Sequence, residues 1–274
     1  MKILCIGSGN MGTALMKSAA GIVGGGNIGF TDIEPSKAET AAQTTGGKVW
    51  ASNAEALSEA DFVFLAVKPQ ALGLVLEEIA ATVKERTSSG NPAVLVSMAA
   101  GWSIAKIQET LRGSVWNDNP PVIRIMPNTP ALIGQGVIAF TPSPEVTPEQ
   151  AEGLEKILAA AGVVDRIGEQ YLNGVTGLSG SGPAFVYLFI EALADAGVRA
   201  GLPRDRALRY AAQTVLGSAA MVKETGRHPG ELKDMVASPG GTTIAGIAAL
   251  ENGAFRGIVM NAVNASFERA KTLE

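Results

Sequence analysis

A glycine-rich motif near the N-terminus has the residue types and spacing that hold phosphate groups. It follows an apolar run, precedes a helical pattern, and consists of Gly7, Ser8, Gly9, Asn10, Met11 and Gly12. In such a G-x-G-x-x-G motif the first glycine permits the tight turn, the second lets backbone amides approach phosphate oxygens, and the third allows close packing of helix on strand. The start of the helix adds a partial positive charge. The motif predicts a dinucleotide site, and an ordinary glycine-rich turn is the alternative.

An acidic residue lies where a ribose-binding carboxylate would be expected. Asp32 follows Gly12 by about 20 residues, at the predicted end of the second strand. A carboxylate there favours NADH, because it repels the 2′-phosphate of NADPH. Between residues 31 and 39 there is no arginine, and Lys37 is the one basic residue. The alternative is that Asp32 is a turn residue or a helix cap before Pro35.

A second glycine turn precedes a helical pattern near the C-terminus, in the sequence Ser238-Pro239-Gly240-Gly241-Thr242-Thr243. Two glycines let successive amides converge, and a new helix N-terminus favours an anion. A small carboxylate is the natural occupant of such a turn. The alternative is a plain threonine N-cap after a glycine turn.

Composition narrows the function classes. The chain has 22 Lys and Arg against 26 Asp and Glu, a net charge of −4, which argues against a nucleic-acid partner. A single cysteine, Cys5, and a single histidine, His228, leave no disulfide and predict no metal site. We expect Cys5 to be buried and His228 to be a turn or cap residue before Pro229. No apolar run approaches the ~20 residues of a membrane span, and Met1–Ile6 runs straight into the glycine loop, so we expect a cytoplasmic protein without a signal peptide.

The first part of the 274-residue chain alternates short, continuously apolar runs with helical patterns. Such runs are typical of strands buried on both faces of a parallel sheet, and their order predicts a doubly wound α/β domain over residues 1–166. The predicted strands are Lys2–Ile6, Asn27–Thr31, Asp61–Val67, Ala93–Ser97, Val122–Met126, Val137–Phe140 and Val163–Ile167. The predicted helices between them are Met11–Val23, Ser36–Thr44, Pro69–Lys84, Ser103–Leu111 and one from about Pro148 to Ala161.

Residues 167–274 are predicted to form an all-α domain. The expected helices are Pro183–Ala200, Arg204–Thr225, Gly230–Val236, Thr243–Asn252 and Phe255–Leu273. The first of these is apolar on nearly every side, which is typical of a helix buried in a core or in an oligomer interface.

Five segments, taken together, resemble the pyrroline-5-carboxylate reductase family in order and spacing. They are Gly7–Gly12 (GSGNMG), Ala66–Gln70 (AVKPQ), Arg124–Pro130 (RIMPNTP), Gly177–Phe185 (GLSGSGPAF) and Asp234–Thr243 (DMVASPGGTT), the last continuing to Glu251. The resemblance implies a Rossmann-like domain followed by an all-α dimerisation domain. It also implies hydride transfer from NADPH or NADH to the C=N bond of Δ1-pyrroline-5-carboxylate, giving L-proline, by a homodimer that can assemble into a decamer. Many members of the family prefer NADPH, whereas Asp32 favours NADH.

The resemblance also implies roles for particular residues. Thr242 and Thr243 would contact the substrate, with the catalytic Thr243 hydroxyl near the ring nitrogen. Ser238 would help to order the loop or to bind the carboxylate, and Gly241 would belong to the same substrate-binding turn. Glu169 matches a position close to bound substrate, and its alternative is a solvated side chain.

On the cofactor side, the resemblance implies contacts from Ala66, Val67, Lys68 and Pro69, and from Asn53. Lys68 could instead be a surface lysine at a strand end, and Asn53 an N-cap for the helix Ala54–Leu57.

Two other functions remain open. One is a reductase of the same architecture that acts on another cyclic imine or a hydroxy acid. The hydroxy-acid enzymes use a lysine on the long interdomain helix, and Pro183–Ala200 contains none. The other is a non-catalytic dinucleotide-binding regulator, which the intact Gly-Gly-Thr-Thr turn argues against.

Overall fold

The computed structural model describes residues 1–113, 116 and 118–273, and the chain divides into two compact units. The first unit comprises Met1–Gly180 and the C-terminal segment from Ser266, and the second comprises Ser181–Ala265. This division follows contacts between residues, whereas the predicted boundary after residue 166 rests on where strand patterns end. That boundary stays a prediction.

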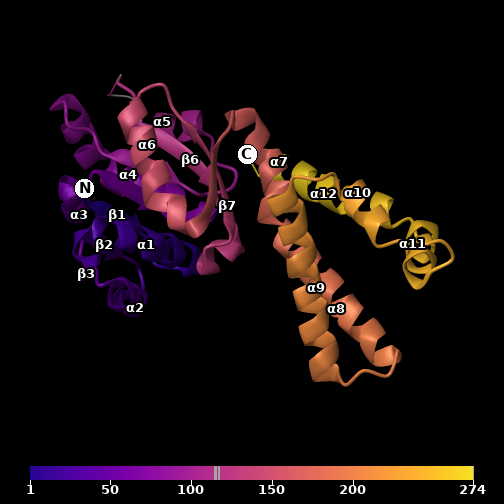
Figure 1. The fold of residues 1–274 in the computed structure, drawn as a ribbon. Coiled ribbons are helices and arrows are strands. Elements are labelled where there is room, and N and C mark those ends of the chain that lie inside the picture. The colour runs from indigo at the N-terminus through magenta and orange to yellow at the C-terminus, as the bar shows by residue number, and fades with distance from the viewer. Residues whose placement is uncertain (114–115, 117, 274) are drawn as a thin grey trace. The chain divides into compact units, whose positions relative to one another are not determined.

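Within the described residues, the first unit is built on an eight-stranded sheet (Figure 1). The strands are β1 (Ile3–Ile6), β2 (Ile28–Thr31), β3 (Lys48–Val49), β4 (Phe62–Leu65), β5 (Val94–Ser97), β6 (Val122–Met126), β7 (Gly136–Pro142) and β8 (Gly162–Arg166). Their order is β3-β2-β1-β4-β5-β6-β7-β8, and every neighbouring pair is parallel except β6 and β7. The predicted Rossmann-like, doubly wound domain is confirmed.

Two features of the sheet differ from the expectation. Strand β3 is two exposed residues long, too short and too polar to give a strand pattern. Strand β7 runs antiparallel to β6, because a short 3₁₀ turn, Thr129–Ile133, joins them where a parallel pair would need a long crossover.

The continuously apolar strands serve two cores, one on each face of the sheet. Along β1, Ile3 and Cys5 pack on one face while Leu4 and Ile6 pack on the other, as the two-residue period of a strand dictates. One core is closed by α1 (Asn10–Val23), α2 (Pro35–Thr45) and α6 (Pro148–Leu158), and the other by α3 (Asn53–Glu59), α4 (Pro69–Ser88) and α5 (Ile104–Arg112). The unit continues through the single-turn α7 (Leu172–Val175) and a π-helical turn, Thr176–Gly180.

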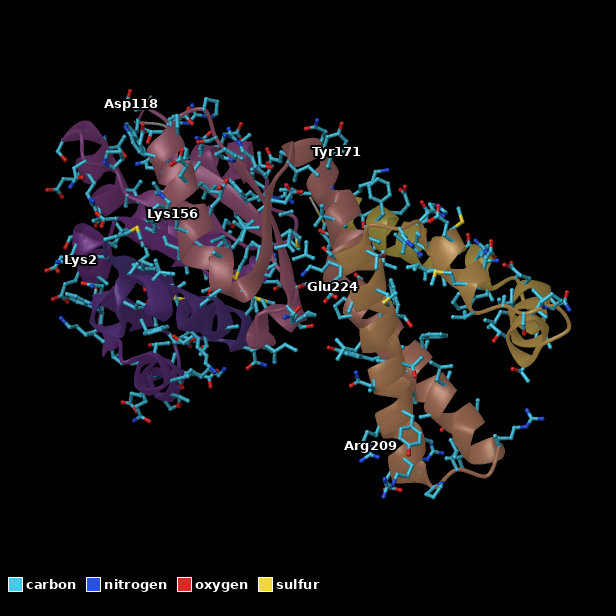
Figure 2. The ribbon with its side chains drawn as sticks, in the orientation of Figure 1. Lys2, Asp118, Lys156, Tyr171, Arg209 and Glu224 are labelled. Carbon is cyan, nitrogen blue, oxygen red and sulfur yellow. The ribbon has the colours of Figure 1, made fainter. Side chains whose placement is uncertain are left out.

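The second unit is helical, which confirms the predicted all-α fold. Its helices are α8 (Gly182–Arg199), α9 (Arg204–Thr225), α10 (Pro229–Met235), α11 (Thr242–Asn252) and α12 (Phe255–Lys271), the last extending into the segment from Ser266. Helices α8 and α9 pair closely, with Ala194, Ala207 and Ala211 buried between them. Figure 2 labels Arg209 and Glu224 near opposite ends of α9.

The helical stretch that contains α8 differs from the expectation that no segment is apolar enough to span a membrane. The stretch Glu169–Arg199 is long and apolar enough to cross a membrane by length and composition, and little of its most apolar part is buried within this chain. The expectation of no such segment counted unbroken apolar residues, whereas this helix tolerates an occasional acid such as Glu191. Length and composition do not separate a membrane helix from one that packs in a protein interface.

Candidate active site

The glycine-rich loop adopts the conformation that its spacing predicts. Gly7 has φ of +93°, and a Cβ there would stand 2.8 Å from the carbonyl carbon of Ala66. A Cβ at Gly12 would stand 2.8 Å from the Gly7 oxygen and 3.0 Å from Cys5 Sγ. Both glycines are therefore required by packing. Gly9 differs, because a Cβ there would meet nothing within 4 Å.

Gly9 is the N-cap of α1, with an extended backbone. The amide of Thr13 donates to the Gly9 oxygen at 2.9 Å, which is the first backbone hydrogen bond of the helix. The amides of Asn10, Met11 and Gly12 come before it and have no acceptor within the helix. The first turn carries no acidic residue. These amides and the space above Gly9 form a cradle that suits a pyrophosphate.

Asp32 follows β2 at the same edge of the sheet as this loop. The strand register pairs Ile6 with Thr31, so the residues after both strands meet there. Asp32 Oδ2 accepts a hydrogen bond from the Ser8 amide at 2.6 Å, and Oδ1 accepts one from the Glu34 amide at 2.9 Å. Asp32 is thus a turn residue, as one alternative held, and it also ties β2 to the phosphate loop.

A cavity of about 360 Å³ opens beside these residues. It is lined by Ile6, Gly7, Thr31, Asp32, Ile33, Trp50, Ala51, Asn53, Val67, Ala71, Leu74, Val75 and Glu78. The phosphate loop borders it, so the structure brings Gly7, Asp32, Asn53 and Val67 to one site. Apolar walls with a few polar groups are typical of a small-molecule pocket.

Asn53 is the first residue of α3, and the cap belongs to its neighbour. Ser52 Oγ accepts from the Glu55 amide at 3.4 Å, so the capping alternative for Asn53 is wrong by one residue. The Asn53 amide instead donates from Nδ2 to Glu78 Oε2 of α4 at 2.9 Å.

The residues after β4 lie next to the same loop. The Ala66 amide donates to the Ile6 oxygen at 2.8 Å. Lys68 is exposed at the N-cap position of α4, and Pro69 begins that helix. The Pro69 oxygen accepts from Trp102 Nε1 at 3.0 Å, which fixes the start of α4 against the loop after β5.

Glu169 belongs to the first unit and is held by two elements, α5 and β6. Its Oε1 accepts from the Ile104 amide at 2.9 Å and from Arg124 Nη1 at 3.1 Å. Arg124 lies in β6 and is 2% exposed. The solvated alternative for Glu169 is therefore wrong, because its carboxylate compensates a buried guanidinium and the N-terminus of α5.

The second glycine turn is in the second unit. Gly240 has φ of +65°, and Gly241, the N-cap of α11, donates its amide to the Ser238 oxygen at 3.1 Å. The Ala245 amide bonds back to Gly241 at 3.3 Å, so the amides of Thr242 and Thr243 precede the helix ladder. The threonine-cap alternative is wrong, since glycine occupies the cap.

The lone cysteine and lone histidine have structural roles, as expected. Cys5 is fully buried in β1, and its thiol donates to the Gly7 oxygen at 3.3 Å. Burial, with a smaller effect from the Asp32 charge, raises the pKa of Cys5 to about 12, so this thiol stays protonated at neutral pH. His228 is the N-cap of α10, and its Nδ1 accepts from the Gly230 amide at 3.1 Å.

Known proteins match this chain over nearly its full length. A family model described as pyrroline-5-carboxylate reductase dimerisation matches residues 169–273, and one described as NADP oxidoreductase, coenzyme F420-dependent, matches residues 2–101. A protein of Methanosarcina acetivorans named pyrroline-5-carboxylate reductase is 43% identical over 99% of this chain and 97% of its own length. The chain belongs to the pyrroline-5-carboxylate reductase family.

Another relative and two solved structures agree. The Escherichia coli protein named pyrroline-5-carboxylate reductase is 40% identical over 99% of this chain and 98% of its own. The structure of the Plasmodium falciparum pyrroline carboxylate reductase with NADP bound is 35% identical, with a TM-score of 0.86, covering 100% of this chain and 98% of that one. The Coxiella burnetii reductase is 32% identical, with a TM-score of 0.89 and the same coverage.

Sequence reasoning missed three residues that the structure places at these sites. Arg124 holds Glu169, Glu78 holds Asn53, and Trp102 fixes Pro69. The sequence did carry a signal for Arg124: it is an arginine inside an apolar, buried strand, and a buried guanidinium needs a carboxylate partner. Glu78 carried no signal, since an acidic residue on an amphipathic helix is usually solvated.

Proposed function

We propose that this protein is a pyrroline-5-carboxylate reductase, which reduces the C=N bond of Δ1-pyrroline-5-carboxylate to give L-proline. One observation carries the proposal. The chain matches reductases of that name over 99% of its length at 40% and 43% identity. Both glycine turns, each at the N-terminus of a helix, lie inside the matched length.

The first unit supplies the dinucleotide site in this proposal. The amides of Asn10 and Met11 bind the pyrophosphate, and Gly9 is a glycine because a side chain would fill the cradle. Asp32 and Asn53 face the adenosine ribose within the cavity beside the loop. Ala66, Val67, Lys68 and Pro69 continue the cofactor wall. A bound reduced nicotinamide would supply the hydride that the imine carbon accepts.

The second unit supplies the groups that hold the substrate. The amides of Thr242 and Thr243 bind the substrate carboxylate at the start of α11, and Ser238 and Gly241 shape the turn that presents them. The Thr243 hydroxyl, the proposed catalytic group, hydrogen-bonds the ring nitrogen as that atom becomes an amine. A protonated imine is already a strong electrophile, so positioning and exclusion of water are the main requirements. Glu169 of the first unit is proposed, from the resemblance alone, as a substrate-binding residue, and its carboxylate is paired with Arg124.

We propose that NADH is preferred over NADPH. The cavity beside the loop is lined by two carboxylates, Asp32 and Glu78, and by no lysine or arginine among its described residues. A 2′-phosphate would meet like charge from both carboxylates there. The structure of the Plasmodium falciparum relative was solved with NADP bound.

The proposed assembly is a homodimer through the second unit, with dimers able to form a decamer, in the cytoplasm. The match of residues 169–273 to a dimerisation model supports the dimer. The exposed apolar side chains of α8 and α9 support it too, because a helix of that composition requires cover.

The test is loss of reduced-nicotinamide absorbance with Δ1-pyrroline-5-carboxylate, run separately with NADH and NADPH, with proline identified as the product. The proposal expects turnover with both cofactors and a higher kcat/KM with NADH. Tight dinucleotide binding without turnover would contradict the reductase and leave a regulator or an enzyme for another imine.

A further inference from the structure

Two large aliphatic side chains at the cavity beside the phosphate loop are exposed to solvent. Ile33, which follows β2, is 97% exposed, and Leu74 of α4 is 72% exposed. Both line the cavity of about 360 Å³ that Gly7 and Asp32 also line. Exposed apolar side chains around a cavity are typical of a ligand site, because the ligand covers them when it binds. This part of the cavity therefore suits a ligand group with an apolar surface.

Trp50 adds an aromatic surface to the same cavity, and packing on β2 holds it there. The Trp50 amide donates to the Phe30 oxygen at 2.9 Å. A Cβ at Gly29 would stand 2.7 Å from Nε1 and 2.8 Å from Cδ1 of the indole. The absence of a side chain at Gly29 thus leaves the space that the indole occupies. The indole is fixed at the cavity wall by its own strand neighbours.

The order of groups in a dinucleotide matches the order of residues around the cavity. The pyrophosphate is assigned to the amides at the start of α1, and the ribose to Asp32, which accepts from the Ser8 amide of the phosphate loop. The base follows the ribose, so it meets the rest of the cavity wall. That wall is mostly apolar and includes the indole of Trp50. An aromatic side chain stacks favourably on the face of a nucleobase.

We infer that Trp50 is a further binding residue for the dinucleotide, whose indole stacks on the adenine base. The inference rests on the proposed dinucleotide site. The same base covers Ile33 and Leu74. Trp50 adds affinity for NADH and NADPH alike, because both carry adenine, and it is separate from the choice between them. The adenine lies at the opposite end of the dinucleotide from the nicotinamide, so Trp50 takes no part in hydride transfer.

The experiment measures binding of ADP-ribose, which carries adenine and lacks nicotinamide, to the full chain by calorimetry and by tryptophan emission. The chain has three tryptophans, so single substitutions assign the emission change. We expect the emission of the wild type to fall on binding, and Trp50→Phe to remove most of that fall. Trp116→Phe is the matched control and should retain it, because Trp116 is buried and does not line the cavity.

Affinity and kinetics of two Trp50 variants separate binding from folding. Trp50→Leu should raise the dissociation constant of ADP-ribose by about tenfold, as expected for the loss of one stacked base. Trp50→Phe keeps an aromatic ring and should raise it by less than about threefold. In steady-state assays, Trp50→Leu should raise KM for NADH and NADPH by the same factor and leave kcat unchanged. A loss of folded protein would instead lower the apparent kcat.

Two results would overturn the inference while leaving the dinucleotide site in place. One is an unchanged dissociation constant of ADP-ribose in Trp50→Leu. The other is a fall in emission in Trp50→Phe as large as in the wild type. Failure of ADP-ribose to bind the wild-type protein would overturn the dinucleotide site itself, and the inference with it.

Discussion

The two units of this protein differ in how well each covers its own apolar surface. In the first unit the sheet strands β1, β2, β4, β5 and β6 are buried along their whole length. In the second unit the core cluster within this chain consists of Ala194, Ala207 and Ala211. Large apolar side chains are exposed there, such as Leu188 at 68% and Met260 at 71%.

The difference shows that one unit completes its fold within the chain and the other does not. Leucine and methionine side chains of α8, α9 and α12 remain uncovered, and each would gain about 1.5–3 kcal/mol by burial. The dimerisation model that matches residues 169–273 supplies the reason, since a second copy would cover this surface. We therefore expect changes on the uncovered apolar faces of the second unit to act on association, and changes in the first unit to act on folding or on the dinucleotide.

The largest effect is expected for a charge placed on the uncovered face of α8. Leu188→Glu should weaken dimer association by about 10³-fold or more, because two copies of the face would each bury a carboxylate. Sedimentation of dilute protein measures this. The matched control is Ile133→Glu, at a first-unit position that is 78% exposed. A Leu188→Glu protein that sediments like the wild type would contradict the view that a second copy covers this face of α8.

The next effect concerns the reactivity of Cys5 within the completed core. Because burial raises its pKa to about 12, the thiol remains protonated above pH 8.5, where a free cysteine ionises. At pH 8 the thiolate fraction should be about 10³-fold lower than in the unfolded chain, and modification by a disulfide reagent slower by at least that factor. The rate is measured with and without urea. Rapid modification of the folded protein would show that the first unit opens readily.

A pair of glycine variants separates folding from binding in the first unit. Gly12→Ala should lower the free energy of unfolding by about 2 kcal/mol, because its Cβ would crowd the Gly7 oxygen and Cys5. Gly9→Ala should leave thermal stability unchanged, since its Cβ meets nothing, while weakening NADH binding at least about tenfold by filling the cradle. Equal stability losses in the two variants would contradict the assigned geometry.

The smallest effect is expected for cofactor choice at Asp32. Asp32→Ser should raise kcat/KM with NADPH relative to NADH by about tenfold, or ~1.4 kcal/mol, by removing like charge while keeping an acceptor for the Ser8 amide. The measurement is the ratio of the two kcat/KM values. An unchanged ratio would remove Asp32 from the ribose site, and Asp32→Asn serves as a second neutral variant.

The sequence predicted the sheet more fully than the site. Buried strands leave a visible pattern of apolar residues, whereas a hydrogen bond between two side chains leaves none. Continuously apolar runs marked the central strands, and the tight turn at Gly7, where φ is +93°, followed from its place in the motif. The exposed β3 and the antiparallel β7 left no such pattern. At the site, the contacts of Glu169 with Arg124 and of Asn53 with Glu78 join residues 45 and 25 positions apart. Such pairs depend on how elements pack, which local sequence does not encode.

We propose different roles for the two units: the first binds the dinucleotide, and the second binds the substrate through Thr243. The measurement that tests it most directly is the kinetics of Thr243→Ala together with its dissociation constant for NADH. We predict that kcat falls by about 10²-fold or more while the NADH dissociation constant changes by less than about twofold. Equal losses of turnover and of NADH affinity would contradict these separate roles of the two units.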